Sequence, residues 1–212
     1  MISGGALALA AFTDSPARSM IASPRPHRPL PSIPQLSVSE GPFAVDPELL
    51  RRALNALNMH HGMITQRDRM AIVDFTAPSS EPRMHLLDVV SGKATRLLVA
   101  HGSGSDPQHT GYLERFSNAV GSNASSEGAF LADDYYVGRH GRSQRLIGLD
   151  PTNDNALERD LVVHSAWYAN DDMIAKHGML GRSQGCFAVG ENCLDTVIAF
   201  LGKGRMIYAA RA

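Results

Sequence analysis

Residues 181–189 read Gly181-Arg182-Ser183-Gln184-Gly185-Cys186-Phe187-Ala188-Val189, a polar turn that runs into an apolar strand. A glycine directly before a cysteine frees backbone space beside the sulfur. His164 follows the apolar run Leu161-Val162-Val163 and lies 22 residues before Cys186. A thiol needs a base to act as a nucleophile at neutral pH, and a histidine can supply one. The pattern predicts a cysteine-nucleophile acyl-transfer enzyme.

Composition limits the classes of protein to which the chain can belong. Its 212 residues, 43% of them hydrophobic, can fill one core of ordinary size. The formal net charge is −1, and the 20 basic residues form no dense cluster, so no nucleic-acid partner is expected. No apolar run approaches the length of a membrane span, so no transmembrane segment is expected either. Two cysteines do not make a disulfide framework.

The chain is expected to divide near residue 44. Residues 1–44 are rich in proline and are predicted to be a disordered tether. The short apolar run at 6–12 leaves two interpretations open, a remnant of a secretion signal and an untidy chain end. Residues 45–212 are predicted to be the catalytic domain. A helix should open it, because Asp46-Pro47-Glu48 supplies an N-cap, a proline at the first helical position and an acidic first turn.

Short runs rich in Val, Ile and Leu follow this helix and predict strands. They lie at 70–75, 84–90, 96–100, 129–137, 145–149, 161–166, 187–189 and 206–210. Ser91-Gly92-Lys93 offers a hairpin turn. One more amphipathic helix is expected at about 192–201, where Gly202 stops it. The fold class predicted is mainly β, with a few peripheral helices.

One pattern in the sequence resembles the signature of the L,D-transpeptidases of bacterial peptidoglycan synthesis. It consists of His164-Ser165, a spacer of residues 166–182, and then Ser183-Gln184-Gly185-Cys186. That family has a YkuD-type catalytic domain. Further motifs extend the resemblance over about residues 70–210 and favour the murein L,D-transpeptidase catalytic-domain branch. They lie at 99–104, 116–118, 125–130, 148–150 and 159–166. The resemblance implies a β-sandwich or barrel-like fold.

The resemblance also implies roles for the central residues. Cys186 would attack a peptide carbonyl as a thiolate, and His164 would take the thiol proton. The backbone carbonyl of Ser165 would hold the second ring nitrogen of His164. Gly185, together with Cys186, would offer backbone N–H groups to the developing oxyanion.

Four further residues are candidates for substrate binding. The planar fork of Arg182 suits a substrate carboxylate, although a solvated surface arginine remains open. Ser183 could touch substrate or hydrogen-bond within its own turn. His101 lies in a loop rich in Gly and Ser, where it could line the pocket or simply be exposed. Tyr168, like Tyr136, could line a peptide groove or contribute to packing.

The reaction implied by the resemblance is a two-step transfer. Cys186 attacks the L-centre carbonyl of the third residue of a donor stem tetrapeptide, and D-Ala leaves. The thioester then passes to an amine of another stem, which gives a 3-3 or 1-3 cross-link. The expected partners are therefore peptidoglycan stem peptides as donor and acceptor, with carbapenem β-lactams as covalent inhibitors. No cofactor is expected, and the location expected is the periplasm or cell envelope after export.

Three alternatives stay open at this stage. Water in place of the acceptor amine would make the same Cys/His site an L,D-carboxypeptidase or another cell-wall amide hydrolase. A non-catalytic wall-binding domain would keep the fold without the activity. A zinc-binding module would use His164, His177, Cys186 and Cys193, but the chain lacks the Cys-x-x-Cys pairs typical of structural zinc sites.

Overall fold

The N-cap at Asp46 starts the first helix where the sequence predicts it. The structure is a computed structural model that describes Met1 and residues 45–212. Helix α1 (Pro47–Met59) begins with Asp46 Oδ1 accepting hydrogen bonds from the N–H groups of Glu48 and Leu49, both at 2.9 Å. The tether and signal remnant predicted within residues 1–44 lie outside the described residues, apart from Met1.

Within residues 45–212, eight strands form one sheet in the order β3-β2-β1-β8-β4-β5-β6-β7. The strands are β1 (Arg69–Asp74), β2 (Met84–Asp88), β3 (Lys93–Leu97), β4 (Gly128–Gly138), β5 (Gly141–Gly148), β6 (Val162–Ser165), β7 (Phe187–Val189) and β8 (Met206–Ala210). The β1–β8 and β6–β7 pairs are parallel and the other pairs are antiparallel. Ala100, shortly after β3, bridges to Ala188 in β7, so the sheet curls towards a closed barrel. The mainly β fold predicted from the sequence is confirmed.

The predicted elements differ from the observed ones mostly at their ends. Strand β3 begins at Lys93, so its hairpin turn lies earlier than expected, with Asp88 opposite Lys93. Helix α3 (Leu194–Leu201) begins two residues later than the predicted helix. Helix α2 (Asp172–His177) is missing from the prediction; none of its residues is fully buried, although Met173 and Ile174 pack against a small buried cluster. Short 3-10 turns η1 (Ser103–Ser105), η2 (Asp154–Ala156) and η3 (Trp167–Ala169) complete the described elements.

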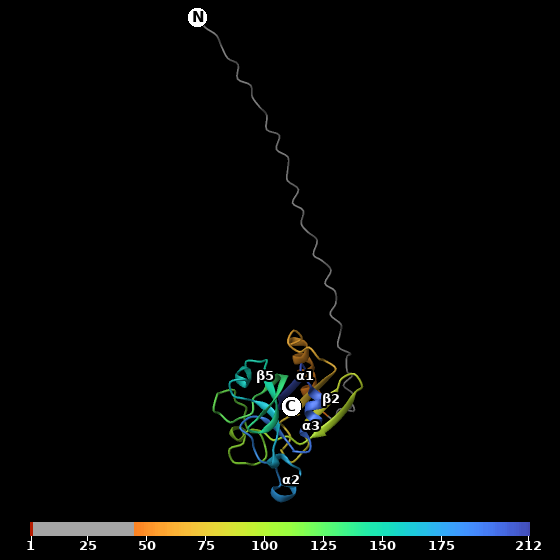
Figure 1. Cartoon of the computed structure of the whole chain (residues 1–212), viewed down its shortest axis with the longest axis vertical. Coiled ribbons are helices and arrows are strands. Elements are labelled where there is room, and N and C mark those ends of the chain that lie inside the picture. The colour runs from red at the N-terminus through yellow and green to blue at the C-terminus, as the bar shows by residue number, and fades with distance from the viewer. Residues whose placement is uncertain (2–44) are drawn as a thin grey trace. The chain divides into compact units, whose positions relative to one another are not determined.

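The hydrophobic core lies between the curled sheet and α3. Ala71 and Val73 of β1 and Val197 and Leu201 of α3 belong to one buried cluster. Met70, Ala71, Ile72 and Val73 are all fully buried, so the middle of β1 is covered on both faces. Helix α1 packs against β1, β4 and β8, and Figure 1 shows α2 projecting from the edge of the folded part. No helix in the described part of the chain is long and apolar enough to cross a membrane.

Candidate active site

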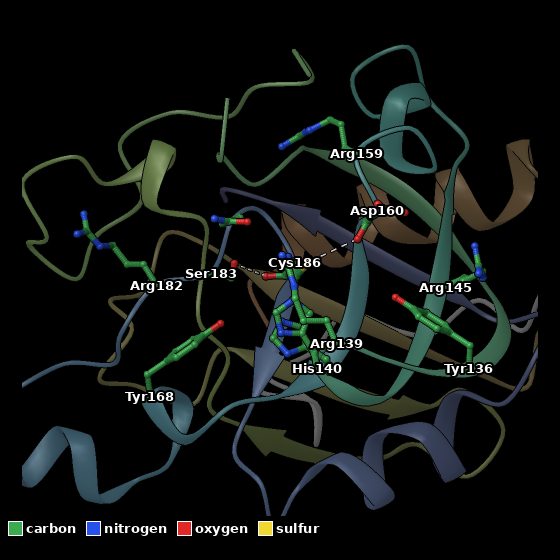
Figure 2. Close-up of a pocket in the computed structure, with 12 residues that line it drawn as sticks. Tyr136, Arg139, His140, Arg145, Arg159, Asp160, Tyr168, Arg182, Ser183 and Cys186 are labelled. Atoms are coloured by element: carbon green, nitrogen blue, oxygen red, sulfur yellow. Dashed lines mark hydrogen bonds between the residues drawn. The ribbon is translucent and has the colours of Figure 1, made fainter. Parts of the chain in front are cut away.

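A cavity of about 710 Å³ opens where the β4–β5 hairpin, strand β6 and the turn before β7 meet. Its lining is polar and mainly basic or aromatic. It consists of Tyr136, Arg139, His140, Arg145, Arg159, Asp160, His164, Tyr168, Arg182, Ser183, Gln184 and Cys186. In Figure 2, Tyr136 and Arg145 lie on one side of Cys186, and Tyr168 and Arg182 lie on the other.

The turn that carries Cys186 requires a glycine at position 185. Gly185 has φ +112°, and a Cβ there would lie 2.6 Å from the Ala124 carbonyl oxygen. Ser183 then fastens the turn, because its Oγ accepts from the Gly185 N–H (3.1 Å) and donates to the Cys186 carbonyl (2.7 Å). Ser183 thus makes the hydrogen bonds within its turn, and it also lines the cavity.

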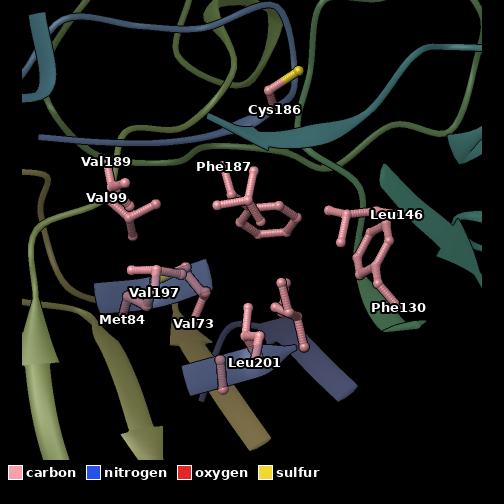
Figure 3. Close-up of a cluster of buried hydrophobic side chains, with 14 of the residues drawn as sticks. Val73, Met84, Val99, Phe130, Leu146, Cys186, Phe187, Val189, Val197 and Leu201 are labelled. Carbon is pink, nitrogen blue, oxygen red and sulfur yellow. The ribbon is translucent and has the colours of Figure 1, made fainter. Parts of the chain in front are cut away.

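Cys186 lies where the hydrophobic core meets the cavity. Figure 3 shows Phe187 and Val189 among the core side chains and Cys186 at the edge of the cluster. Its Sγ lies 3.7 Å from the Asp160 carbonyl oxygen, to which the thiol can donate. Burial raises the pKa of the Cys186 thiol above its ordinary value, although the Val162 N–H and the Arg159 guanidinium favour the thiolate. The resting residue is therefore a protonated thiol that needs a base.

His164 is held on β6 in a defined tautomer. Its Nδ1 lies 2.9 Å from the Ser165 carbonyl oxygen, which is the contact that the family resemblance implies. Because a carbonyl can only accept, Nδ1 carries the proton and Nε2 is left as the acceptor. Burial lowers the pKa of His164 and the neighbouring His140 lowers it further, whereas the hydrogen bond to Ser165 opposes both. At neutral pH the ring is therefore an unprotonated base.

Strand pairing brings His164 and Cys186 to the same cavity. In the parallel β6–β7 pair His164 lies opposite Ala188, two residues beyond Cys186. Cys186 lies in the turn directly before β7, so the pairing places the cysteine turn beside β6. Both side chains line the cavity.

Arg159 is a functional candidate that the sequence marks only as part of the motif at 159–166. Its guanidinium donates to the backbone carbonyls of Ser117 (2.8 Å) and Ala124 and to the Ser126 hydroxyl. The same group is among the causes that favour a thiolate on Cys186. Arg159 therefore fastens the loop beside the cysteine turn and adds a positive charge near the sulfur.

The residues predicted to bind substrate have different outcomes. Tyr168 and Arg182 line the cavity, but Arg182 Nη1 donates to the Asp106 and Pro107 carbonyls. Burial and the nearby Cys186 raise the pKa of Tyr168 to about 12, so its phenol stays protonated. His101 needs a correction, because it does not line the cavity and is only 1% exposed.

His101 instead bridges two buried charged groups. Its Nδ1 lies 2.7 Å from Arg83 Nη2, and its Nε2 lies 3.2 Å from Asp106 Oδ2. Its backbone carbonyl accepts the Ser183 N–H at 2.9 Å. His101 thus lies outside the cavity and supports the cysteine turn through the hydrogen bond of its backbone carbonyl to Ser183.

Three basic side chains that the β4–β5 hairpin brings to the cavity are not predicted from the sequence. They are Arg139, His140 and Arg145. The His140 ring stacks on that of His164, with centroids 4.4 Å apart. No local pattern marks these residues. Only the antiparallel register, in which Ser143 faces His164, brings the hairpin beside β6.

The described residues offer no cluster that could hold a metal ion. Among residues 45–212, His, Cys, Asp and Glu nowhere form a group of three or more suitable for metal binding. The zinc alternative through His164, His177, Cys186 and Cys193 therefore has no ligand set in the described part of the chain.

The chain therefore has a mainly β domain with a basic cavity. This cavity is lined by a buried cysteine, Cys186, and by a histidine, His164, whose Nδ1 carries the proton. The profile of the L,D-transpeptidase catalytic domain matches residues 43–210 of the sequence, and the chain belongs to this family. The search of curated proteins found no match.

Solved structures to which the chain is similar include an L,D-transpeptidase from Mycobacterium smegmatis, with 12% identity over 68% of this chain and 58% of that one (TM-score 0.41). LD transpeptidase LdtMt1 in complex with imipenem has 10% identity over 68% of this chain and 59% of that one (TM-score 0.41). An L,D-transpeptidase from Mycobacterium tuberculosis H37Rv has 11% identity over 68% and 58% (TM-score 0.40). The chain spans less than two thirds of the length of each.

Proposed function

We propose that this chain is a peptidoglycan L,D-transpeptidase of the cell envelope, with Cys186 as nucleophile and His164 as general base. The observation that carries the proposal is that a protonated thiol and a neutral imidazole with its proton on Nδ1 line the same cavity. Family membership gives the reaction class. Action on stem peptides implies export and a part in cell-wall biogenesis and cell shape.

In the first step His164 Nε2 takes the thiol proton, and Cys186 Sγ attacks the carbonyl of the third residue of the donor. The new S–C bond forms as the C–N bond to D-Ala breaks, and the imidazolium returns its proton to the leaving amine. The Gly185 N–H already donates to Ser183 Oγ, so the Cys186 N–H is the better candidate for the oxyanion. In the second step an acceptor amine attacks the thioester, His164 takes its proton, and the thiol is restored.

The test is incubation of the protein with a tetrapeptide-containing muropeptide, with products read by mass spectrometry. Wild type should release D-Ala and form a cross-linked dimer, whereas a tripeptide without dimer would identify an L,D-carboxypeptidase. Cys186→Ala should lose both products. Cys193→Ser is the matched control, because this half-buried cysteine does not line the cavity.

A carbapenem offers a second readout of the same thiol. Acylation should add the mass of the drug to wild type and to Cys193→Ser but not to Cys186→Ala. Unchanged D-Ala release by Cys186→Ala would end the proposal.

A further inference from the structure

The cavity is strongly positive. Arg139, Arg145, Arg159 and Arg182 line it, whereas Asp160 is the only carboxylate that the described residues contribute to the lining. A pocket that gathers one sign of charge raises the local concentration of ligands with the opposite charge. The cavity is therefore suited to an anionic ligand.

The four arginines divide into two pairs. Arg159 and Arg182 donate to backbone carbonyls of neighbouring loops. Within residues 45–212, the side chains of Arg139 and Arg145 form neither a hydrogen bond nor an ion pair with a protein group, and that of Arg145 stacks on Tyr136. Arg159 and Arg182 thus stabilise the loops that form the cavity. The side chains of Arg139 and Arg145 remain available to bind a ligand.

Arg145 is also held in a defined place. Its guanidinium carbon lies 4.6 Å from the centroid of the Tyr136 ring, which also lines the cavity. Stacking uses the face of a guanidinium and leaves its N–H edge free for a bidentate contact. An arginine that is already oriented loses less conformational entropy when it binds a carboxylate.

The hairpin side of the cavity is separate from the side that holds Arg182. Figure 2 shows Tyr136 and Arg145 across Cys186 from Tyr168 and Arg182. A peptide that lies over the sulfur has Arg145 on the hairpin side of the same cavity. The bond that is cleaved in the donor lies one residue from its terminal carboxylate, so the cavity that holds Cys186 must also hold that carboxylate.

We propose that Arg145, stacked on Tyr136 and assisted by Arg139, binds the terminal carboxylate of the donor peptide. The proposal rests on the proposed function for its choice of ligand. A guanidinium and a carboxylate form two parallel charge-assisted hydrogen bonds. The site would therefore select donors that end in a free carboxylate one residue beyond the scissile bond, and it assigns to the hairpin the role that the sequence suggested for Arg182.

The test is a binding measurement in the Cys186→Ala background, so that no turnover interferes. A tetrapeptide donor with a free carboxylate and the same peptide with a C-terminal amide are titrated by calorimetry. The free acid should bind roughly tenfold or more tightly than the amide, as expected for hydrogen bonds to a charged group. Adding Arg145→Gln should reduce this ratio to about twofold and leave the affinity of the amide unchanged, and Arg145→Lys should fall between them.

Arg142→Gln is the matched control. Arg142 belongs to the same hairpin, but it pairs with Asp195 at 2.7 Å and does not line the cavity. This variant should keep the preference for the acid. Three results would each overturn the carboxylate site. The Cys186→Ala parent could bind the acid and the amide equally well, or it could bind neither peptide. The ratio of the two affinities could also stay unchanged when Arg145→Gln is added. Failure of the proposed function would appear separately, as the absence of D-Ala release by wild type.

Discussion

His140 stacks on the proposed base, with its ring at 28° to that of His164. His164 is only 2% exposed, whereas His140 is exposed to solvent. Burial is the main cause that lowers the pKa of His164, and a positive charge on His140 opposes a second positive charge beside it. The pair therefore keeps His164 unprotonated, and able to act as a base, at lower pH than an isolated histidine.

His140→Gln should raise the pKa of His164, because it removes the neighbouring charge and opens the ring to water. The acidic limb of activity would then move to higher pH, since His164 acts as a base only when it is unprotonated. NMR titration of the His164 ring protons measures this pKa directly. His140→Arg restores a positive charge and should keep the pKa low. A pKa in His140→Gln at or below that of wild type would contradict this role.

At the scale of elements, the loop after β3 supports the cysteine turn through the backbone. The Ser103 N–H donates to the Ser183 carbonyl (2.8 Å), and the Gly102 N–H donates to the Ser125 hydroxyl (3.0 Å). A Cβ on Gly102 would lie 2.3 Å from the Asn123 carbonyl oxygen and 2.8 Å from the Gly185 nitrogen. These atoms belong to backbone, so the loop has no side chain that could move aside.

Gly102→Ala should therefore lower the free energy of unfolding by about 1–3 kcal/mol, the usual range for overpacking. It should also reduce D-Ala release, because the Cys186 turn shifts with the loop. Denaturant unfolding and the muropeptide assay measure the two effects. Gly62→Ala is the control, since a Cβ there meets nothing within 4 Å, and it should leave both quantities close to wild type. Wild-type stability and activity in Gly102→Ala would show that the loop can relax.

Helix α1 offers a second test at this scale. Asp46 Oδ1 accepts two N–H groups of the first turn. Asp46→Ala should lower the free energy of unfolding by about 1 kcal/mol, and Asp46→Asn, which keeps an acceptor, should stay near wild type. Denaturant unfolding of the three proteins gives the comparison. An equal loss in both variants would mean that the carboxylate charge, rather than the cap, stabilises the helix.

Local chemistry explains why some elements can be predicted from the sequence and others cannot. The start of α1 follows from Asp46 and Pro47, and the strands follow from runs of apolar residues. The burial of His101 depends instead on its contacts with Asp106, five residues further along the same loop, and with Arg83, 18 residues earlier in the chain. The approach of His140 and Arg145 to the cavity depends on the β5–β6 register, which no short pattern encodes. Such contacts need the tertiary structure.

At the scale of the whole molecule, a buried polar network connects Arg83, the residue before β2, and the loop after β3 to the cysteine turn. Arg83 is fully buried, and its guanidinium donates to the carbonyls of Ala77 and Val99 and to His101 Nδ1. Because arginine can only donate, the proton of His101 lies on Nε2, which donates to Asp106. Burial and the charge of Arg83 lower the pKa of His101 from 6.5 to about 4.

This shift makes the folded state sensitive to acid. Below pH 6.5 the unfolded chain takes up a proton at His101, whereas the folded chain does not until about pH 4, so acid favours unfolding. The contribution of His101 to the free energy of unfolding should fall by about 2 kcal/mol between pH 7 and pH 5. Since the network supports Ser183 through the His101 carbonyl, the cysteine turn should loosen with it.

His101→Gln separates this titration from the loss of packing. The variant should be less stable than wild type at pH 7, because Gln cannot bridge Arg83 and Asp106 in the same geometry. Its stability should nevertheless fall by about 2 kcal/mol less than that of wild type between pH 7 and pH 5, since the titrating group is gone. Urea unfolding at the two pH values gives the difference, and from pH 7 to pH 8 the two proteins should change in parallel. Equal losses on acidification would mean that His101 binds its proton as readily in the folded chain as in the unfolded one, and the neutral bridge between Arg83 and Asp106 would have to be abandoned.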